Sequence, residues 1–335
     1  MWLRALARLF AAAALVAVLA AAGAGWFVWT FRAPGPLESE VLVEVPRGAG
    51  LHGIADRLAE AGVIDDPRLF AFGVWLYGRA DELRAGEYAF PAGVSAEGAM
   101  ALLVEGRTVS HALTVPEGLT SAEIVALLRE DDRLTGEIAE VPPEGALLPE
   151  TYHFRRGDAR ADLLERMVAA MDDAVAALWE EREEGLPLAT PEEAVVLASI
   201  IEKETGVPGE RPTVASVFIN RLERGMPLQS DPTVIYALTQ GAGPLGRPLL
   251  RSDIEQTESP YNTYRTGGLP PGPIANPGRA AIAAALGPAE TEYLYFVADG
   301  TGGHAFARTL EEHQQNVWQW RRIRDQQGQA QGGED

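Results

Sequence analysis

The chain has 335 residues and no cysteine. It therefore has no disulfide framework, no thiol nucleophile and no cysteine-type zinc site. Its five histidines lack the spacing of metal ligands: His52, His111, His153, His304 and His313. A Gly-x-Ser-x-Gly elbow, a His-Glu-x-x-His motif, a phosphate-binding Gly-rich loop and a dinucleotide fingerprint are also absent from the sequence. We therefore expect a reaction that uses neither a metal nor a cofactor.

Basic residues are also scarce. The chain has 28 lysines and arginines against 48 aspartates and glutamates, for a net charge of −20, and Lys203 is its only lysine. A strongly acidic surface argues against nucleic acids and polyanionic substrates as partners. The charge balance is ordinary for a soluble periplasmic domain, and the absence of cysteine fits an exported protein without disulfides. We expect no nucleic-acid partner.

One long run has no charge at all and covers residues 9–31. As a helix rising about 1.5 Å per residue, this run would span roughly 35 Å, which is enough to cross a bilayer. Trp26 and Trp29 stand where an interfacial aromatic belt would lie, and the positive-inside rule keeps Arg4 and Arg8 in the cytoplasm. The sequence therefore predicts a single transmembrane helix near the N-terminus.

This helix sets the expected topology, with residues 1–8 in the cytoplasm, residues 9–31 in the membrane, and the rest of the chain on the periplasmic side. A cleavable signal peptide is the alternative, because the alanines at 20–22 suit signal peptidase. The run is long for the apolar region of a signal peptide, which favours an anchor. We expect a stiff linker over 32–40 and a disordered, Gln/Gly-rich tail over 324–335.

Between the linker and the tail we expect an α+β protein of two domains, at 41–110 and 111–323. The first begins with an apolar alternation over 41–45, which predicts a strand, and continues with a helical stripe. Its Val45-Pro46-Arg47-Gly48 turn recurs 70 residues later as Val115-Pro116-Glu117-Gly118. Such small strand–helix units resemble the LysM type of glycan-binding module. A plain scaffold is the alternative, because Val-Pro-x-Gly before a helix is also ordinary turn chemistry.

The most informative segment is a helix predicted over 191–204 in the larger, mixed α/β domain. Thr190 is typical of an N-cap before a first-turn proline, and Gly206 is a stop signal. At 3.6 residues per turn one apolar stripe carries Leu197, Ile200, Ile201 and Glu204. Glu202 and Lys203 are expected to face solvent. The helix thus ends by placing one carboxylate on its apolar face.

Glu204 is the candidate catalytic residue. Burial disfavours the charged form of a carboxyl group, and so does the negative end of a helix, so both raise its pKa. A carboxyl group that stays protonated near neutral pH can act as a general acid, which is what breaking a glycosidic bond requires. The alternative is a structural glutamate that pairs with an arginine.

Downstream of Glu204 the sequence is rich in side chains that suit saccharides. The candidate binding residues are Gln229, Ser230, Tyr261, Asn262, Tyr264, Asn276 and His304. Gly and Pro fill eight of the twelve positions over 267–278, so this segment is a rigid loop, and rigid loops often carry binding residues. Structural turns are the alternative, and a lone histidine is often incidental. Asp231, just before Pro232, is predicted to be an N-cap rather than a catalytic residue.

Several of these segments together resemble the MltG (YceG-like) endolytic murein transglycosylases of the bacterial inner membrane, and the resemblance covers nearly all of the chain. The matching stretches are 148–152, 198–205, 210–211, 214–222, 229–236, 261–264, 268–278 and 293–304. In that family the catalytic residue is the second glutamate of the Glu-Lys-Glu-Thr run, which is Glu204 here. Glu150 stands where an aspartate is also common.

The resemblance implies a non-hydrolytic reaction within peptidoglycan glycan strands. Glu204 would protonate the oxygen of the β-1,4 bond between N-acetylmuramic acid and N-acetylglucosamine. The 6-hydroxyl of the same muramic acid would then attack, leaving a 1,6-anhydro end. Because this nucleophile is intramolecular, one glutamate suffices where a hydrolase needs two carboxylates. The family also implies proximity to peptidoglycan synthases and no cofactor.

Two other functions remain open from the residues alone. One is a two-carboxylate muramidase, in which Asp231 or Glu210 would be the partner of Glu204. The other is a non-catalytic peptidoglycan-binding scaffold, which would tolerate the loss of Glu204. The chemical nature of the cleavage product distinguishes these two functions from each other and from the transglycosylase activity.

Overall fold

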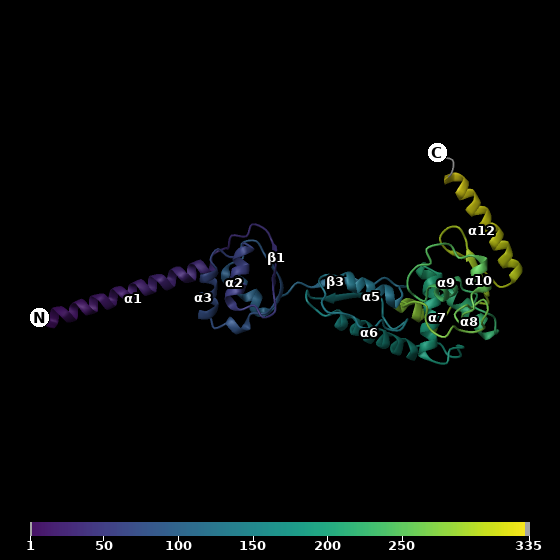
Figure 1. Cartoon of the computed structure of the whole chain (residues 1–335), viewed down its shortest axis with the longest axis horizontal. Coiled ribbons are helices and arrows are strands. Elements are labelled where there is room, and N and C mark those ends of the chain that lie inside the picture. Colours follow the sequence, from purple (N-terminus) through teal and green to yellow (C-terminus); the bar gives the residue numbers. More distant parts are fainter. Residues whose placement is uncertain (1, 332–335) are drawn as a thin grey trace. The chain divides into compact units, whose positions relative to one another are not determined.

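The computed structural model describes residues 2–331, and these form a mixed α+β protein with a long apolar helix at the N-terminus (Figure 1). The chain divides into two compact units. Within the described residues, unit 1 comprises 2–111 and 153–157, and unit 2 comprises 112–152 and 158–331. The α+β class and the N-terminal helix agree with the sequence predictions.

The N-terminal helix α1 covers Trp2–Arg32. Among the described residues it is the one helix long and apolar enough to cross a membrane, and a signal sequence would have the same length and composition. Most of its side chains are exposed, but Phe27 and Phe31 near its C-terminal end are buried in the core of unit 1. The end of α1 is therefore part of unit 1.

The rest of unit 1 consists of a two-stranded antiparallel sheet and three helices. Its elements are β1 (Val41–Val45), α2 (Leu51–Glu60), α3 (Pro67–Leu76), the short η1 (Ala80–Glu82), β2 (Gly86–Phe90) and α4 (Ala96–Glu105). Val41 of β1 lies opposite Phe90 of β2, and Val45 opposite Gly86. The alternation in β1 places Val43 and Val45 in the core.

Unit 2 contains most of the helices of the chain. Its elements are β3 (His111–Thr114), α5 (Ser121–Glu130), β4 (Thr151–Phe154), α6 (Arg160–Glu180), α7 (Pro191–Glu204), η2 (Pro208–Glu210), α8 (Arg211–Glu223), α9 (Asp231–Thr239), α10 (Arg251–Gln256), α11 (Arg279–Leu286), β5 (Tyr295–Ala298), β6 (His304–Ala307) and α12 (Leu310–Gln331). Strands β3 and β4 pair with each other, and β5 pairs antiparallel with β6. The division between the units falls within β3 and β4.

Helix α7 is the centre of unit 2. Every residue from Ala194 to Ile201 is buried, and α6, α8 and α11 pack around it. Small and β-branched side chains on all sides of the helix let these neighbours approach closely. A helix buried on every face is held firmly by its surroundings. The end of α7 is therefore a well-fixed place for a reactive group.

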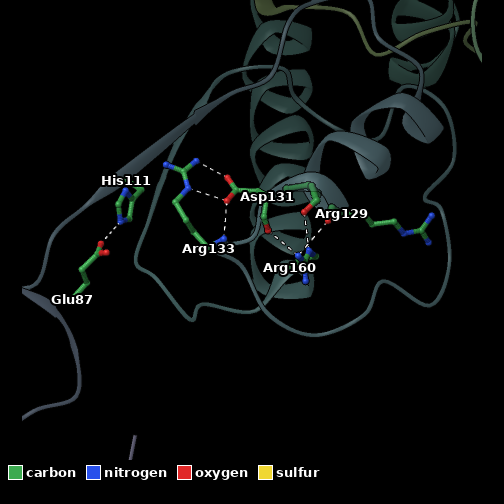
Figure 2. Close-up of polar contacts among 7 residues, drawn as sticks. Glu87, His111, Arg129, Asp131, Arg133 and Arg160 are labelled. Carbon is green, nitrogen blue, oxygen red and sulfur yellow. Dashed lines mark hydrogen bonds and ion pairs between the residues drawn. The ribbon is translucent and has the colours of Figure 1, made fainter. Parts of the chain in front are cut away.

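Arg160 closes the C-terminal end of α5. The last carbonyls of a helix lack partners within the helix, and the Arg160 guanidinium donates to the carbonyl oxygens of Leu128 at 2.8 Å and Asp131 at 2.8 Å (Figure 2). At the other end of α5, Thr120 and Glu123 form a capping box. Side-chain hydrogen bonds thus satisfy backbone groups at both ends of α5.

The C-terminal segment differs from the composition-based expectation. Helix α12 continues to Gln331, so residues 324–331 are helical where the sequence suggests a disordered tail. Residues 332–335 of that predicted tail lie outside the described residues.

Candidate active site

The site is built on the C-terminal end of α7. Thr190 is the N-cap, and its hydroxyl accepts a hydrogen bond from the backbone N–H of Glu193 at 3.3 Å, as the sequence predicts. At the other end Thr205 leaves the helical conformation with φ −135°, so Glu204 is the last helical residue. The predicted stripe is correct for the three apolar residues before Glu204, all of which are fully buried.

The carboxyl group of Glu204 is largely buried, although the residue as a whole is partly exposed. The hydroxyl of Ser230 donates to Oε1 of Glu204 at 2.6 Å. Burial raises the pKa of Glu204 from 4.5 to about 7, and the nearby charge of Asp231 also raises it. The Ser230 bond, His304 and Arg221 lower it, but they do not outweigh burial. Glu204 is therefore poised to carry a proton near neutral pH.

A cleft of about 360 Å³ lies beside Glu204. It brings together residues from α7, α8, α9, α12, β5 and the loops between them: Glu204, Arg221, Leu228, Gln229, Asp231, Tyr264, Tyr295, Phe296, Leu310 and His313. Aromatic faces, a carboxyl group, a carboxylate, a guanidinium and an amide thus share one hollow. Apolar faces with a few convergent polar groups are typical of a ligand-binding or active site.

Ser230 and Gln229 are fixed by the segment that follows α10. The backbone N–H of Ser230 donates to the hydroxyl of Thr263 at 3.0 Å, and that of Gln229 donates to the Thr263 carbonyl at 3.1 Å. Gln229 has φ +51°, a left-handed conformation that is uncommon for residues other than glycine. This strained turn sets the direction in which the Ser230 hydroxyl approaches Glu204.

Asp231 does not cap α9, contrary to the sequence prediction. The N-cap position belongs to Ser230, and no side chain makes a capping bond there. Instead the carboxylate of Asp231 accepts a hydrogen bond from the hydroxyl of Tyr264 at 2.6 Å. Burial raises the pKa of Tyr264, so this phenol stays protonated and can only donate to Asp231. Asp231 and Tyr264 are therefore a linked pair in the wall of the cleft.

Asn262 and Asn276 lie in the interior rather than in the cleft. The Asn262 amide donates to the carbonyls of Ile254 and Thr257, both at 2.9 Å. The Asn276 side chain accepts from the backbone N–H of Leu147 at 2.9 Å and donates to nearby oxygens. Both residues are completely buried. They hold loops together and do not line the cleft, although the amide oxygen of Asn262 accepts a hydrogen bond from the backbone N–H of Tyr264 at 3.1 Å.

Tyr261 and His304 also fall outside the lining of the cleft. The ring of Tyr261 packs against Tyr236 with centroids 4.8 Å apart. His304 bonds Glu210 twice, through Nδ1 at 2.7 Å and through its backbone N–H at 2.8 Å. Burial opposes ionisation of Glu210, but these bonds outweigh it and lower the pKa of Glu210. Of the predicted binding residues, Gln229 and Tyr264 line the cleft, and Ser230 is hydrogen-bonded to Glu204, which also lines it.

Arg221 is a functional candidate that the sequence analysis missed. It is buried, its Nε donates to the carbonyl of Leu294 at 2.6 Å, and its Nη1 donates to the carbonyl of Leu228 at 2.8 Å. Its guanidinium also lies 5.2 Å from the ring centre of Tyr295. An arginine on a helix face beside apolar neighbours was the available signal. The Leu228 carbonyl comes from the loop just after the helix, but the Leu294 carbonyl is 73 residues away, and no local pattern reveals it.

His313, on α12, was also missed. Its ring stacks on Tyr295 at 5.2 Å, and its Nδ1 is buried without a hydrogen-bond partner in the described structure. Burial lowers the pKa of His313, so its imidazole is neutral at physiological pH. It adds a flat, uncharged ring to the lining of the cleft.

The YceG-like family model matches residues 43–319, which is most of the chain. The chain belongs to the YceG-like family. An endolytic murein transglycosylase of Bacillus subtilis (strain 168) is 32% identical, with the match covering 82% of this chain and 83% of that protein.

Two further comparisons agree. An endolytic murein transglycosylase of Streptococcus pneumoniae serotype 2 (strain D39) is 29% identical over 90% of this chain but only 63% of its own length. A crystal structure at 2.6 Å of a YceG-like protein from Listeria monocytogenes has a TM-score of 0.53 and 31% identity, covering 83% of this chain and 99% of that one.

In this YceG-like chain Glu202 does not face solvent, contrary to the sequence prediction. Only 5% of its side chain is exposed. It accepts hydrogen bonds from Arg211 at 3.0 Å and from the backbone N–H of Gly278 at 2.9 Å, and Arg211 also bonds Glu117 at 3.1 Å. Three segments that are distant in the sequence therefore meet beside the last turn of α7.

Among the residues that the structure describes, no group of three or more histidines, aspartates and glutamates is placed to hold a metal ion.

Proposed function

We propose that the chain is an endolytic murein transglycosylase in which Glu204 acts first as an acid and then as a base. Its substrate is the β-1,4 bond between N-acetylmuramic acid and N-acetylglucosamine within nascent glycan strands. The observation that carries this proposal is a carboxyl group with a pKa of about 7 beside an aromatic-lined cleft. Membership of the YceG-like family and the names of its relatives support the same reaction.

The first step is protonation of the glycosidic oxygen. The Ser230 hydroxyl donates a hydrogen bond to Oε1 of Glu204, so we assign the acidic proton to Oε2. As this proton passes to the oxygen, the bond from C1 of muramic acid breaks, and its electron pair leaves with the N-acetylglucosamine. Positive charge develops at C1, and Glu204 is left as a carboxylate that stabilises it.

The second step closes the ring. The 6-hydroxyl of the same muramic acid attacks C1 and gives its proton to Glu204, which returns to its starting state. The product is a 1,6-anhydro-muramic end, and no water is consumed. An intramolecular hydroxyl needs no second carboxylate to activate it, because its proximity replaces that activation. Asp231 then serves to raise the pKa of Glu204 and to orient Tyr264.

Substrate contacts follow from the lining of the cleft. Tyr264 and Tyr295 offer faces for sugar rings, and Gln229 offers an amide for the N-acetyl groups. Asn262 and Asn276 act indirectly, by holding the loops that carry these residues. We assign the catalytic domain to residues 111–323.

Unit 1 supplies a second glycan contact in this proposal. Its two-stranded sheet and packed helices fit a LysM-like module over residues 41–110, which would hold the strand while unit 2 cuts it. With α1 as an uncleaved anchor in the inner membrane, the enzyme would act in the periplasm on strands leaving the peptidoglycan synthases.

The test is mass spectrometry of the products from purified peptidoglycan, using the full chain in detergent. Wild type should release fragments with anhydro-muramic ends, and Glu204→Gln should release none. Glu192→Gln is the matched control, because it makes the same change at an exposed position of the same helix. Reducing ends would instead indicate a hydrolase with Asp231 as the second carboxylate. No cleavage by wild type would favour a binding scaffold.

A further inference from the structure

Unit 1 exposes a group of large apolar side chains along α3 and the end of α1. Trp26 and Trp29 on α1 are 62% and 71% exposed, and Phe72, Trp75 and Leu76 on α3 are 49%, 66% and 54% exposed. We name these five residues the aromatic face. On α3 the intervening Phe70, Ala71 and Val74 are buried, so one side of the helix is in the core and the other presents its apolar residues outward. Several large apolar side chains exposed on one unit in this way indicate an interaction site.

The aromatic face is rigidly joined to α1. The ring of Phe27 meets that of Phe72 edge-on with centroids 5.2 Å apart, and Phe31 stacks on Tyr77 at 5.8 Å. Gly73 permits this approach, because a Cβ at that position would lie 2.3 Å from the Phe31 ring. Figure 1 shows α1 entering the unit beside α3. The two helices are therefore parts of one body.

The depth of Phe27 in the membrane determines the depth of α3, because the two are in contact. Arg8 and Arg32 bound the uncharged run, and a hydrocarbon core of roughly 30 Å takes up about 20 residues of helix. When residues 9–31 span the membrane, Phe27 lies just inside the outer edge of that core. Phe72 touches Phe27 and therefore lies at nearly the same level.

We propose that the aromatic face docks into the outer interfacial layer of the bilayer that α1 crosses, where the hydrocarbon core meets the headgroups. Tryptophan and other amphipathic rings prefer that layer, where an apolar body and a polar tip are both satisfied. Arg68 and Arg79 lie one turn before and one turn after the apolar stripe of α3, within reach of lipid phosphates, although Arg79 also pairs with Glu82. Helix α3 contains no acidic residue. In this proposal unit 1 contacts the membrane through two elements, α1 and α3.

The absence of cysteine from the native sequence makes this proposal directly testable. Trp75→Cys and Leu76→Cys are each spin-labelled in the full chain, reconstituted in vesicles of phosphatidylethanolamine and phosphatidylglycerol. Asp56→Cys, on the exposed side of α2, is the aqueous control, and Leu19→Cys, within α1, is the lipid control. Thermal unfolding of each labelled variant establishes that unit 1 is intact, since all four positions are exposed.

The readout is the ratio of collision rates with oxygen, which partitions into lipid, and with a water-soluble nickel complex. We expect this ratio to be several-fold higher at positions 75 and 76 than at position 56, and nearer to that at position 19. A ratio equal to that at position 56 would overturn the proposal, because the face would then be in water. Low collision rates with both reagents would also overturn it, because protein would then cover the face.

Discussion

At the scale of one residue, the raised pKa of Glu204 implies that its buried carboxyl group lowers the stability of the protein above pH 4.5. Its pKa is 4.5 when unperturbed and about 7 in the folded protein. Between these two values the folded state keeps a proton that the unfolded state has lost, so the free energy of unfolding falls as the pH rises. Below pH 4.5 both states are protonated and nothing is lost.

We therefore expect Glu204→Gln to stabilise the protein at pH 8 by up to about 3 kcal/mol, and to have little effect below about pH 4.5. The glutamine is neutral at every pH and can still accept the Ser230 hydrogen bond. Tm measured in one detergent over this pH range checks the prediction. Glu192→Gln, the exposed control, should give no such rise, and an equal Tm for Glu204→Gln and wild type at pH 8 would contradict it.

The second residue-scale prediction concerns Asp231. Its charge raises the pKa of Glu204. In the proposed mechanism kcat requires Glu204 to be protonated, so activity should decline as the pH rises through about 7. Asp231→Asn should move this decline to lower pH by about half a unit. The measurement is kcat against pH. Glu223→Gln removes a charge from an exposed site on α8 and should leave the profile in place. An unmoved decline in Asp231→Asn would show that Glu204 does not sense this charge.

Residues differ in how far the sequence could predict them. Thr190 and Glu204 were predictable, because a cap and a helical phase depend only on neighbours within a few turns. Asn262 and Asn276 were not, because a buried amide and an exposed one look alike until the carbonyls around them are known. Glu202 was wrongly predicted to face solvent for the same reason, because its partners Arg211 and Gly278 come from other segments.

At the scale of elements, the last turn of α7 depends on this buried ion pair. Glu202→Gln should destabilise unit 2 by about 2 kcal/mol, because the buried Arg211 loses its one buried charged partner and keeps only the half-exposed Glu117 among the described residues. The neighbouring Lys203 is exposed and bonds only the carbonyl of Gly118 in the described structure, so Lys203→Met should cost under about 0.5 kcal/mol. Denaturant unfolding of both variants makes the comparison, and equal costs would refute the structural role given to Glu202.

The packing of α1 on α3 gives the next prediction. Gly73→Ala should destabilise unit 1 by about 2 kcal/mol, because Phe31 is fully buried and cannot move away from the new methyl group. Gly53→Ala on α2 is the control, since no atom lies within 4 Å of a Cβ there. That variant should gain up to about 1 kcal/mol from helix propensity. Thermal unfolding of unit 1 distinguishes the two, and a stabilised Gly73→Ala variant would show that the two helices separate readily.

At the scale of the whole molecule, the chain passes between the two units three times, at 111–112, 152–153 and 157–158. Unit 1 therefore contains a short returning segment, 153–157, that is far along the sequence from the rest of it. Glu87 on β2 contacts the chain where it leaves unit 1 and where it returns. Its carboxylate bonds His111, as Figure 2 shows. It also accepts a hydrogen bond from Arg156 at 3.0 Å. Glu87 is buried although it lies in a strand of only five residues.

Glu87→Gln should loosen the segment 153–157 and so speed tryptic cleavage after Arg156 at neutral pH. Burial raises the pKa of Glu87, but the bonds from His111 and Arg156 outweigh it and lower that pKa. Its stabilising effect is therefore present above its unfolded pKa and is lost as the pH falls through the lower folded value. The Tm difference between variant and wild type should accordingly shrink in acid. Glu44→Gln is the matched control, because Glu44 faces Glu87 across the β1–β2 pair but is exposed. Equal cleavage rates for the two variants would show that the returning segment is held by other contacts.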